Sequence, residues 1–293
     1  MKLSIVIVTW NSAADIDACI DSINFGSEFE VIVVDNASAD ATLGLLRRHH
    51  HLRLVENSSN LGYARANNQG LKLATGEYVL LLNPDTRVEL GALDTLCSYL
   101  DEHPAVGAVA PRLISLDGTT QFSIRSLPTA ASLLWELVGL SRLFPKSHIF
   151  GRWKMKYFDY RRTAEVEQPM ASCLMLRKAV LDSLVPHSSL LTPPFLDERF
   201  PMFYNDVDLS KRMADAGWKT VYVADARVLH RHGASTKQVR AKMIRESHRS
   251  AFRYLRKHDH SGLFWLKAIV LLPLLEITGL IRVLAYRLSR RTP

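Results

Sequence analysis

The chain has 293 residues, 47% of them hydrophobic, including five tryptophans, enough for a well-buried core in one large domain or one domain with an appendage. Its three cysteines are too few and too widely spaced for a disulfide framework or a zinc cluster, so we expect small buried side chains in a reducing compartment. The net charge of +8 is uneven: residues 230–293 hold 14 Lys and Arg against 3 Asp and Glu, and the first 229 residues sum to −3.

Strands and helices are expected to alternate over the first 110 residues. The run LSIVIVT at 3–9 is continuous and β-branched, which predicts a strand buried on both faces. It is too short for a signal sequence, so we expect no export. Further strands are predicted at 31–35, 52–57, 78–83 and 107–111, with helices opening at Asn11-Ser12 and at 37–40. This alternation predicts a parallel sheet with right-handed crossovers.

Polar residues stand at the carboxyl ends of three predicted strands, namely Thr9, Asp35 and the pair Asn83/Asp85. Ligands of such sheets bind beyond these strand ends. The competing interpretation is that these residues only cap helices or close turns. Capping or turn formation could account for one of these residues, but it accounts poorly for all three together. We therefore expect a ligand site at this edge.

The second half is less regular. A helical apolar stretch (130–144) and a basic aromatic segment (150–162) precede a buried strand (170–177). A helix is predicted from near Asp206 to a C-cap at Gly217, followed by short strands at 220–224 and 226–230. Asp206 and Asp208 fall in the first turn of that helix, where carboxylates are favoured anyway.

Taken together, the motifs resemble those of the family 2 glycosyltransferases, specifically the rhamnosyltransferase-like branch. The resemblance runs from about residue 3 to Ser235 and implies the GT-A fold, an α/β fold with a mostly parallel central sheet flanked by helices. It implies a domain over 1–236, with a nucleotide-sugar half (1–115) and an acceptor-binding, catalytic half (116–236), and basic amphipathic helices over 237–293. The segments that carry it are SIVIVTWNS, VVDNASAD, NLGYARANNQG, LLLNPDT, MASCLMLRKAV, and FLDERFPMFYNDVDLSKRMADAGW with ARVLHRHGAS.

The resemblance also implies which residues contact the nucleotide sugar. Asp35 would accept hydrogen bonds from the nucleobase or ribose. Gly62 would let the backbone approach closely, and Arg65 would pair with a diphosphate oxygen at a helix N-terminus. A solvated helix position is an equally open interpretation of Arg65. The full set is Thr9, Asn11, Asp35, Asn60, Gly62, Arg65 and Asn83.

Many family members end the fourth strand with Asp-X-Asp, where this chain has Asn83-Pro84-Asp85. This form is common in the rhamnosyltransferase-like branch, so Asp85 is expected to be the one carboxylate on a metal. The family places a histidine after the last short strand, which matches His230, with His232 as a competitor. Asp and His with diphosphate oxygens and waters suit Mg²⁺ or Mn²⁺.

The acceptor hydroxyl needs a general base. The family supplies one from a Glu-Asp pair that opens a late helix, and here the pair reads Asn205-Asp206. The resemblance therefore assigns the base to Asp206, with Asp208 as runner-up. A single base opposite the leaving group implies inversion at the anomeric carbon. The missing Glu bears on acceptor specificity more than on the reaction.

The C-terminal tail is basic and apolar. Its longest charge-free run, 268–275, is shorter than the ~20 apolar residues that span a bilayer. We therefore expect helices lying in the membrane interface, with Trp265 and leucines toward lipid. The alternative is packing on the catalytic domain or in a homodimer. The segment 150–162, through Arg152 and Lys156, is a candidate for holding a lipid-linked, anionic diphosphate acceptor.

The sequence thus predicts a metal-dependent, inverting glycosyltransferase. The donor is a nucleotide-diphosphate sugar, with dTDP-rhamnose as a candidate, and the acceptor a cell-surface glycan or lipid-linked precursor. We expect a cytoplasmic protein, peripheral on the inner face of the cell membrane, with no nucleic-acid partner. A nucleotidyltransferase is disfavoured because TWNSAADID has no Gly, Lys or Arg. A basic membrane- or nucleic-acid-binding protein without activity is the alternative, but it leaves the polar strand ends unexplained.

Overall fold

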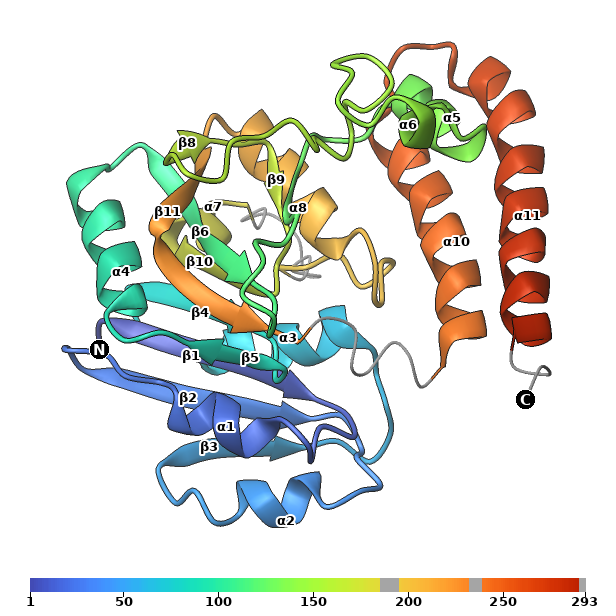
Figure 1. Ribbon diagram of the computed structural model, residues 1–293. Coiled ribbons are helices and arrows are strands. Elements are labelled where there is room, and N and C mark those ends of the chain that lie inside the picture. Colours follow the sequence, from blue (N-terminus) through green and yellow to red (C-terminus); the bar gives the residue numbers. More distant parts are fainter. Residues whose placement is uncertain (185–194, 232–238, 290–293) are drawn as a thin grey trace.

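The computed structural model describes residues 1–184, 195–231 and 239–289. Within these residues the main sheet has nine strands in the order β3-β2-β1-β4-β10-β6-β11-β5, with β8 (Ala164–Glu165) paired to β11. Helices cover both faces of the sheet, and two long helices stand beside it (Figure 1). The predicted α/β class is confirmed.

The first four strands, all mutually parallel, form one half of the sheet. They are β1 (Leu3–Thr9), β2 (Phe29–Asp35), β3 (Leu52–Glu56) and β4 (Tyr78–Leu82). β1 and β4 are buried along their whole length, which explains their unbroken apolar sequences. The register pairs Thr9 with Asp35 and Asp35 with Glu56, so these strand ends meet at one edge.

The other half mixes strand directions. β10 (Cys173–Arg177) lies antiparallel between β4 and β6 (Val106–Ile114). The two strands predicted at 220–224 and 226–230 form a single strand, β11 (Lys219–His230), parallel to β6. The two-strand prediction was wrong because β11 continues through an irregularity between Val223 and Arg227. The register with β6 shifts there, but β11 pairs with β6 both before and after it.

Short helices connect the early strands, and longer ones cover the sheet. Among the described residues up to 220, the helices are α1 (Ile16–Asp21), α2 (Thr42–Leu46), α3 (Tyr63–Leu73), α4 (Ala92–Glu102), α5 (Ala130–Leu137), α6 (Leu140–Leu143), α7 (Lys178–Ser183) and α8 (Asn205–Asp215). α1 begins later than the Asn11-Ser12 cap predicts, because Asn11 has a positive φ of 49° and belongs to the turn. The single helix expected over 130–144 is broken at Gly139, whose φ is +85°.

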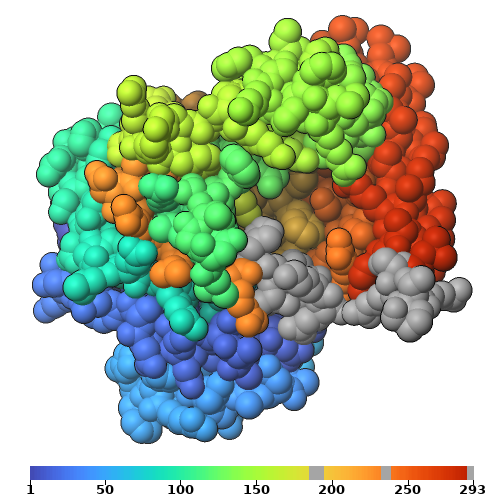
Figure 2. Space-filling view, in the orientation of Figure 1, coloured from blue at the N-terminus to red at the C-terminus, as the bar shows by residue number. Residues whose placement is uncertain are grey.

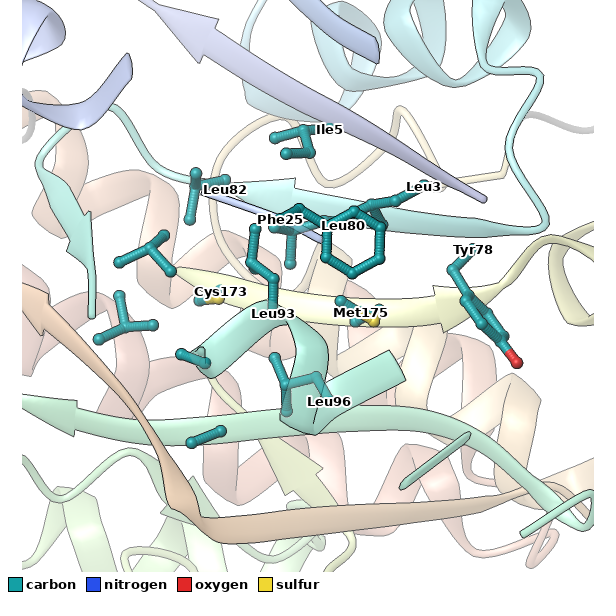
Figure 3. Close-up of a cluster of buried hydrophobic side chains, with 14 of the residues drawn as sticks. Leu3, Ile5, Phe25, Tyr78, Leu80, Leu82, Leu93, Leu96, Cys173 and Met175 are labelled. Atoms are coloured by element: carbon teal, nitrogen blue, oxygen red, sulfur yellow. The ribbon is translucent and has the colours of Figure 1, made fainter. Parts of the chain in front are cut away.

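Apolar side chains from the sheet and helices form a core on each face. Figure 3 shows one of them, where Leu93 and Leu96 of α4 lie against Leu80 and Met175 of the central strands. The second cluster lies under α3, α7 and α8. The three cysteines are buried and free, as predicted.

Two long helices complete the described chain, α10 (Arg240–His258) and α11 (Phe264–Ser289). They pack on each other, on α5, and on the segment that leads into α8, in a cluster that includes Tyr204, Tyr254 and Leu271. The helical tail is therefore confirmed. The predicted boundary at residue 236 lies outside the described residues.

Candidate functional site

Asp85 and His230, far apart in sequence, lie side by side at one end of the sheet. The strand β5 (Thr86–Val88), which sequence reasoning missed, pairs antiparallel with β11 so that His230 faces Thr86. Nε2 of His230 is 3.5 Å from Oδ1 of Asp85, and the two side chains are 2% and 8% exposed. The structure thus brings together the two predicted metal ligands.

The ring of His230 is held by Gln121. Nδ1 of His230 is 2.8 Å from Oε1 of Gln121, and Nε2 of Gln121 donates to the His230 carbonyl at 2.7 Å. An amide oxygen only accepts, so Nδ1 donates to Gln121, and Nε2, which faces Asp85, is the nitrogen that a metal would bind. Metal-binding histidines usually have such an orienting partner. Gln121 belongs to no predicted motif and was missed.

One carboxylate oxygen and one imidazole nitrogen are ligands that suit Mg²⁺ or Mn²⁺. Across the three described ranges, no cluster of three or more His, Cys, Asp or Glu could hold a metal. A cation at this pair would therefore draw its remaining ligands from substrate and water. The competing ligand, His232, lies outside the described residues.

Asn83 connects the end of β4 to the acceptor half. Its backbone N–H donates to the Ser172 carbonyl at 2.9 Å. The Tyr63 hydroxyl lies 3.3 Å from both Oδ1 of Asn83 and the Ala171 carbonyl. Burial, together with the negative charges of Asp206 and Asp85, raises the pKa of Tyr63. Tyr63, which sequence reasoning did not single out, thus joins Asn83, two residues before Asp85, to Ala171.

Asp206 stands in the first turn of α8, two residues after Tyr204, which has a left-handed φ of 67°. Its carboxylate accepts from Nε2 of Gln168 at 3.2 Å and from the N–H of Val207 at 2.9 Å. Burial raises the pKa of Asp206, and hydrogen bonds from Val207 and the nearby Arg125 charge oppose this only in part. A carboxylate of raised pKa is a stronger base, as proton abstraction requires.

Asp208 has a different role from the runner-up base that the sequence suggests. It is fully buried and accepts from Nε of Arg212 at 2.9 Å, Nζ of Lys257 at 2.5 Å and Nε2 of His258 at 2.7 Å. Burial alone would raise its pKa, but these donors lower it. The catalytic interpretation of Asp208 is replaced by a structural one, because its oxygens join α8 to α10.

Thr9 and Asp35 lie at the predicted strand ends but are fully buried. Asp35 accepts from the Thr9 hydroxyl at 2.9 Å, and from the hydroxyl and N–H of Ser38 at 2.5 and 2.9 Å. Asn11 accepts from the Ala39 N–H at 2.8 Å. Direct contact of Thr9 or Asp35 with a nucleoside would require this turn to open. In this structure they shape the turn.

Asn60 and Gly62 form a turn organised by Asn36. Nδ2 of Asn36 donates to Oδ1 of Asn60 at 3.1 Å and to the Gly62 carbonyl at 3.2 Å. Gly62 has a φ of +87°, and a Cβ there would lie 2.9 Å from the Pro201 carbonyl oxygen. The close backbone approach expected at Gly62 is therefore real, but its neighbour is the loop before α8.

Arg65 points outward from the first turn of α3. Its side chain is 60% exposed, and its Nε is 3.9 Å from the Glu198 carboxylate. An ion pair this loose and exposed contributes little to stability. The structure therefore matches the solvated interpretation of Arg65, and its contact with a diphosphate stays a prediction.

Comparisons with known proteins identify the family and the fold of the chain. A sequence model described as "Glycosyl transferase family 2" matches residues 4–183. An N-acetylglucosaminyl-diphospho-decaprenol L-rhamnosyltransferase from Mycobacterium tuberculosis is 28% identical over 284 residues, covering 91% of this chain and 87% of that protein.

Solved structures of TarS from S. aureus have the same fold. TarS 1–349 superposes with a TM-score of 0.54 at 17% identity, covering 97% of this chain and 82% of that one. Its complex with UDP gives a TM-score of 0.52 at 19% identity, covering 85% of this chain and 65% of that one. The fold is thus GT-A, as the resemblance implied. By its matched residues, the chain belongs to glycosyl transferase family 2 and is a glycosyltransferase.

Proposed function

We propose that the chain catalyses metal-dependent, inverting transfer of a sugar from a nucleotide-diphosphate donor to a hydroxyl of a lipid-linked acceptor. The observation that carries this proposal is the meeting of Asp85 and His230 at 3.5 Å. The Tyr63 hydroxyl supports a shared site, because it lies 3.3 Å from Oδ1 of Asn83, two residues before Asp85, and 3.3 Å from the carbonyl of Ala171, whose backbone also bonds Asp206.

Asp85 and His230 would hold Mg²⁺ or Mn²⁺, with Gln121 fixing the histidine ring. When bound, the cation neutralises charge on the diphosphate leaving group. Asn83 and Tyr63 present an amide and a hydroxyl beside this position. Asn11 and Asn60 frame the nucleoside side through the turns that they close.

Asp206 would take the proton of the acceptor hydroxyl. The acceptor oxygen then bonds to the anomeric carbon while the bond from that carbon to the diphosphate oxygen breaks. The nucleoside diphosphate leaves with the electron pair. Because one carboxylate activates a single attack from the face opposite the leaving group, the anomeric configuration inverts.

Rhamnose is the proposed sugar, because the M. tuberculosis relative is named an L-rhamnosyltransferase. The test is nucleotide release from dTDP-rhamnose and from UDP-N-acetylglucosamine, with Mn²⁺, Mg²⁺ or EDTA. We expect turnover with dTDP-rhamnose that EDTA abolishes. Turnover only with the UDP sugar would contradict the donor, and metal-independent or absent turnover with both would contradict the proposed reaction.

We further propose that α11 lies on the inner face of the cell membrane. By length and composition alone, α11 could cross a bilayer, because Pro273 does not interrupt the helix. However, it packs along α10, which carries exposed Arg and Lys, so a spanning α11 would carry those charges into lipid. Its outer face is apolar: Trp265, Leu266, Ile269, Val270, Ile277, Leu280, Ile281, Leu284 and Leu288 are each 47–70% exposed.

Ile269→Asp with Leu280→Asp is expected to weaken binding to anionic phospholipid vesicles at least ~10-fold, because two exposed aliphatic side chains that would enter the lipid become carboxylates. Cosedimentation measures this. Leu90→Asp is the matched control, since Leu90 is 85% exposed but lies before α4, and it should bind as wild type. If the wild-type chain is a dimer without lipid and the double variant a monomer, α11 is an interface between copies and the membrane proposal is wrong.

A further inference from the structure

Buried polar atoms without a partner gather on the small sheet beside Asp206. This sheet consists of β7 (Ile124–Arg125) paired antiparallel with β9 (Gln168–Pro169). In the described ranges, the buried side-chain atoms without a hydrogen-bond partner are Oγ of Ser123, Oγ of Ser126, Nε1 of Trp153 and Oε1 of Gln168. Most buried polar atoms in proteins are paired, so such a group of exceptions calls for an explanation.

All four lie on or against this sheet. Ser123 and Ser126 flank β7, and Gln168 begins β9. Trp153 is joined to β7 because its carbonyl accepts from the Ser126 N–H at 3.1 Å. Concentration in one place suggests a ligand rather than scattered defects in packing.

Gln168 ties this sheet to the base. Its side chain is 1% exposed, and its Nε2 donates to Oδ2 of Asp206 at 3.2 Å and to the Pro169 carbonyl at 2.9 Å. Oε1 belongs to the same planar carboxamide, so the unpartnered oxygen lies beside the nitrogen that contacts Asp206. A polyhydroxylated ligand at Asp206 would offer it a hydroxyl donor.

Arg125 adds a cation to the same place. It is the register partner of Gln168 across the β7–β9 pair. Its guanidinium lies 5.7 Å from the centroid of the Trp153 ring, and that ring lies 6.4 Å from Tyr204, two residues before Asp206. Arg125 forms no salt bridge within 4 Å among the described residues, although its charge also acts on Asp206, whose pKa it lowers. A half-buried guanidinium that lies over an indole and has no salt bridge among the described residues suits a phosphate.

The two cations that the sequence favoured have other neighbours. Arg152 is 54% exposed and lies 3.9 Å from Glu167, and Nζ of Lys156 lies over the Phe122 ring at 5.8 Å. The segment 150–162 therefore contributes Trp153 to the neighbourhood of Asp206. In the space-filling view, a hollow opens between the lobe that holds α5 and α6 and the α10–α11 pair (Figure 2). Gold-coloured atoms of the chain leading into α8 form its floor.

We propose that Arg125, Trp153 and Gln168 form the acceptor subsite, in which Arg125 binds a phosphate of an anionic acceptor and Gln168 accepts from a hydroxyl of its sugar. The subsite rests on the proposed function, since it presumes that Asp206 activates the acceptor. It predicts that the enzyme distinguishes a sugar carried on a diphosphate from the same sugar on a neutral carrier, and that Arg125 makes this distinction.

The test compares two acceptors with dTDP-rhamnose as donor: N-acetylglucosamine on a short prenyl diphosphate, and N-acetylglucosamine on a neutral alkyl chain of similar length. Arg125→Ala is expected to lower kcat/KM for the diphosphate acceptor about 10- to 100-fold, mostly through KM, because one charge-assisted contact is lost. The neutral acceptor should lose less than about threefold, since it never made that contact. The readout is the ratio of the two values, because a change in the basicity of Asp206 would affect both acceptors alike.

Arg125→Lys should recover part of the preference, and Arg47→Ala, an exposed arginine after α2 that pairs with Glu56, should leave it unchanged. A thermal unfolding midpoint close to that of the wild type shows that the variants are folded. Equal losses with both acceptors, or an unchanged ratio, would overturn the subsite. Absence of wild-type transfer to either acceptor would instead contradict the proposed function.

Discussion

Asp85→Ala is expected to lower metal-dependent nucleotide release at least ~10²-fold, because it removes the only carboxylate proposed to hold the cation against the leaving diphosphate. His230→Ala should act similarly, since Nε2 of His230 lies 3.5 Å from that carboxylate. The measurement is the rate of nucleotide release from the donor at saturating Mn²⁺. His103→Ala is the control. His103 is an exposed histidine just before the start of β6, whereas His230 lies near the other end of that strand, so this variant should be as active as wild type.

Metal binding itself separates this account from a general loss of structure. With two protein ligands, Mn²⁺ should bind weakly to the free protein and much more tightly with a nucleoside diphosphate, as titration calorimetry would show. Gln121→Ala should reduce the Mn²⁺ affinity of the ternary complex about 10- to 100-fold, because His230 loses the partner that orients its ring. Tight Mn²⁺ binding to the free protein would contradict a site built from two protein ligands.

Asp206→Asn is expected to abolish transfer while leaving the fold as stable as wild type or more so. Burial raises the pKa of Asp206, so the folded chain disfavours its ionised form. The resulting destabilisation is present at pH values above the folded pKa and vanishes below the pKa of the unfolded chain, about 3.9. Because Asn carries no charge, the substitution removes this destabilisation at neutral pH. For the same reason, the acid limb of the pH–rate profile should lie above the range of an ordinary aspartate.

Asp208→Asn, two residues along the same helix, is the matched comparison and should behave oppositely. The donors around Asp208 lower its pKa, so its stabilising contribution is present above the unfolded pKa and lost as pH falls through the folded one. Removing this buried charge should cost about 3 kcal/mol of unfolding free energy at pH 7. Chemical denaturation measures both variants. A destabilised Asp206→Asn, or an unaffected Asp208→Asn, would contradict the division of roles.

The sequence predicts the strands and the polar residues at their ends because burial on both faces leaves long apolar runs. It also pairs Asp85 with His230, through the family resemblance. It does not predict β5, since three residues carry too little periodicity, yet β5 sets the register that places the pair.

Gln121 and Gln168 act through tertiary contacts alone, so no local pattern marks them. The rule that carboxylates are favoured in the first turn of a helix does not distinguish Asp206 from Asp208. The three donors that bind Asp208 come from α8 itself and from α10, and only the folded chain separates one carboxylate from the other. Thr9 and Asp35 occupy the predicted edge, but their mutual hydrogen bonding is invisible to sequence position.

The salt bridges of Asp208 bear on how the protein is made. Two of its three partners, Lys257 and His258, come 49 and 50 residues later in the chain, and His230 also follows α8. While the ribosome is still synthesising α10, the nascent α8 must hold Asp208 with Arg212 alone or leave it in water. Since domains fold as their residues emerge, the parallel half of the sheet can form early, but α8 gains all the partners of Asp208 only after α10 has been synthesised.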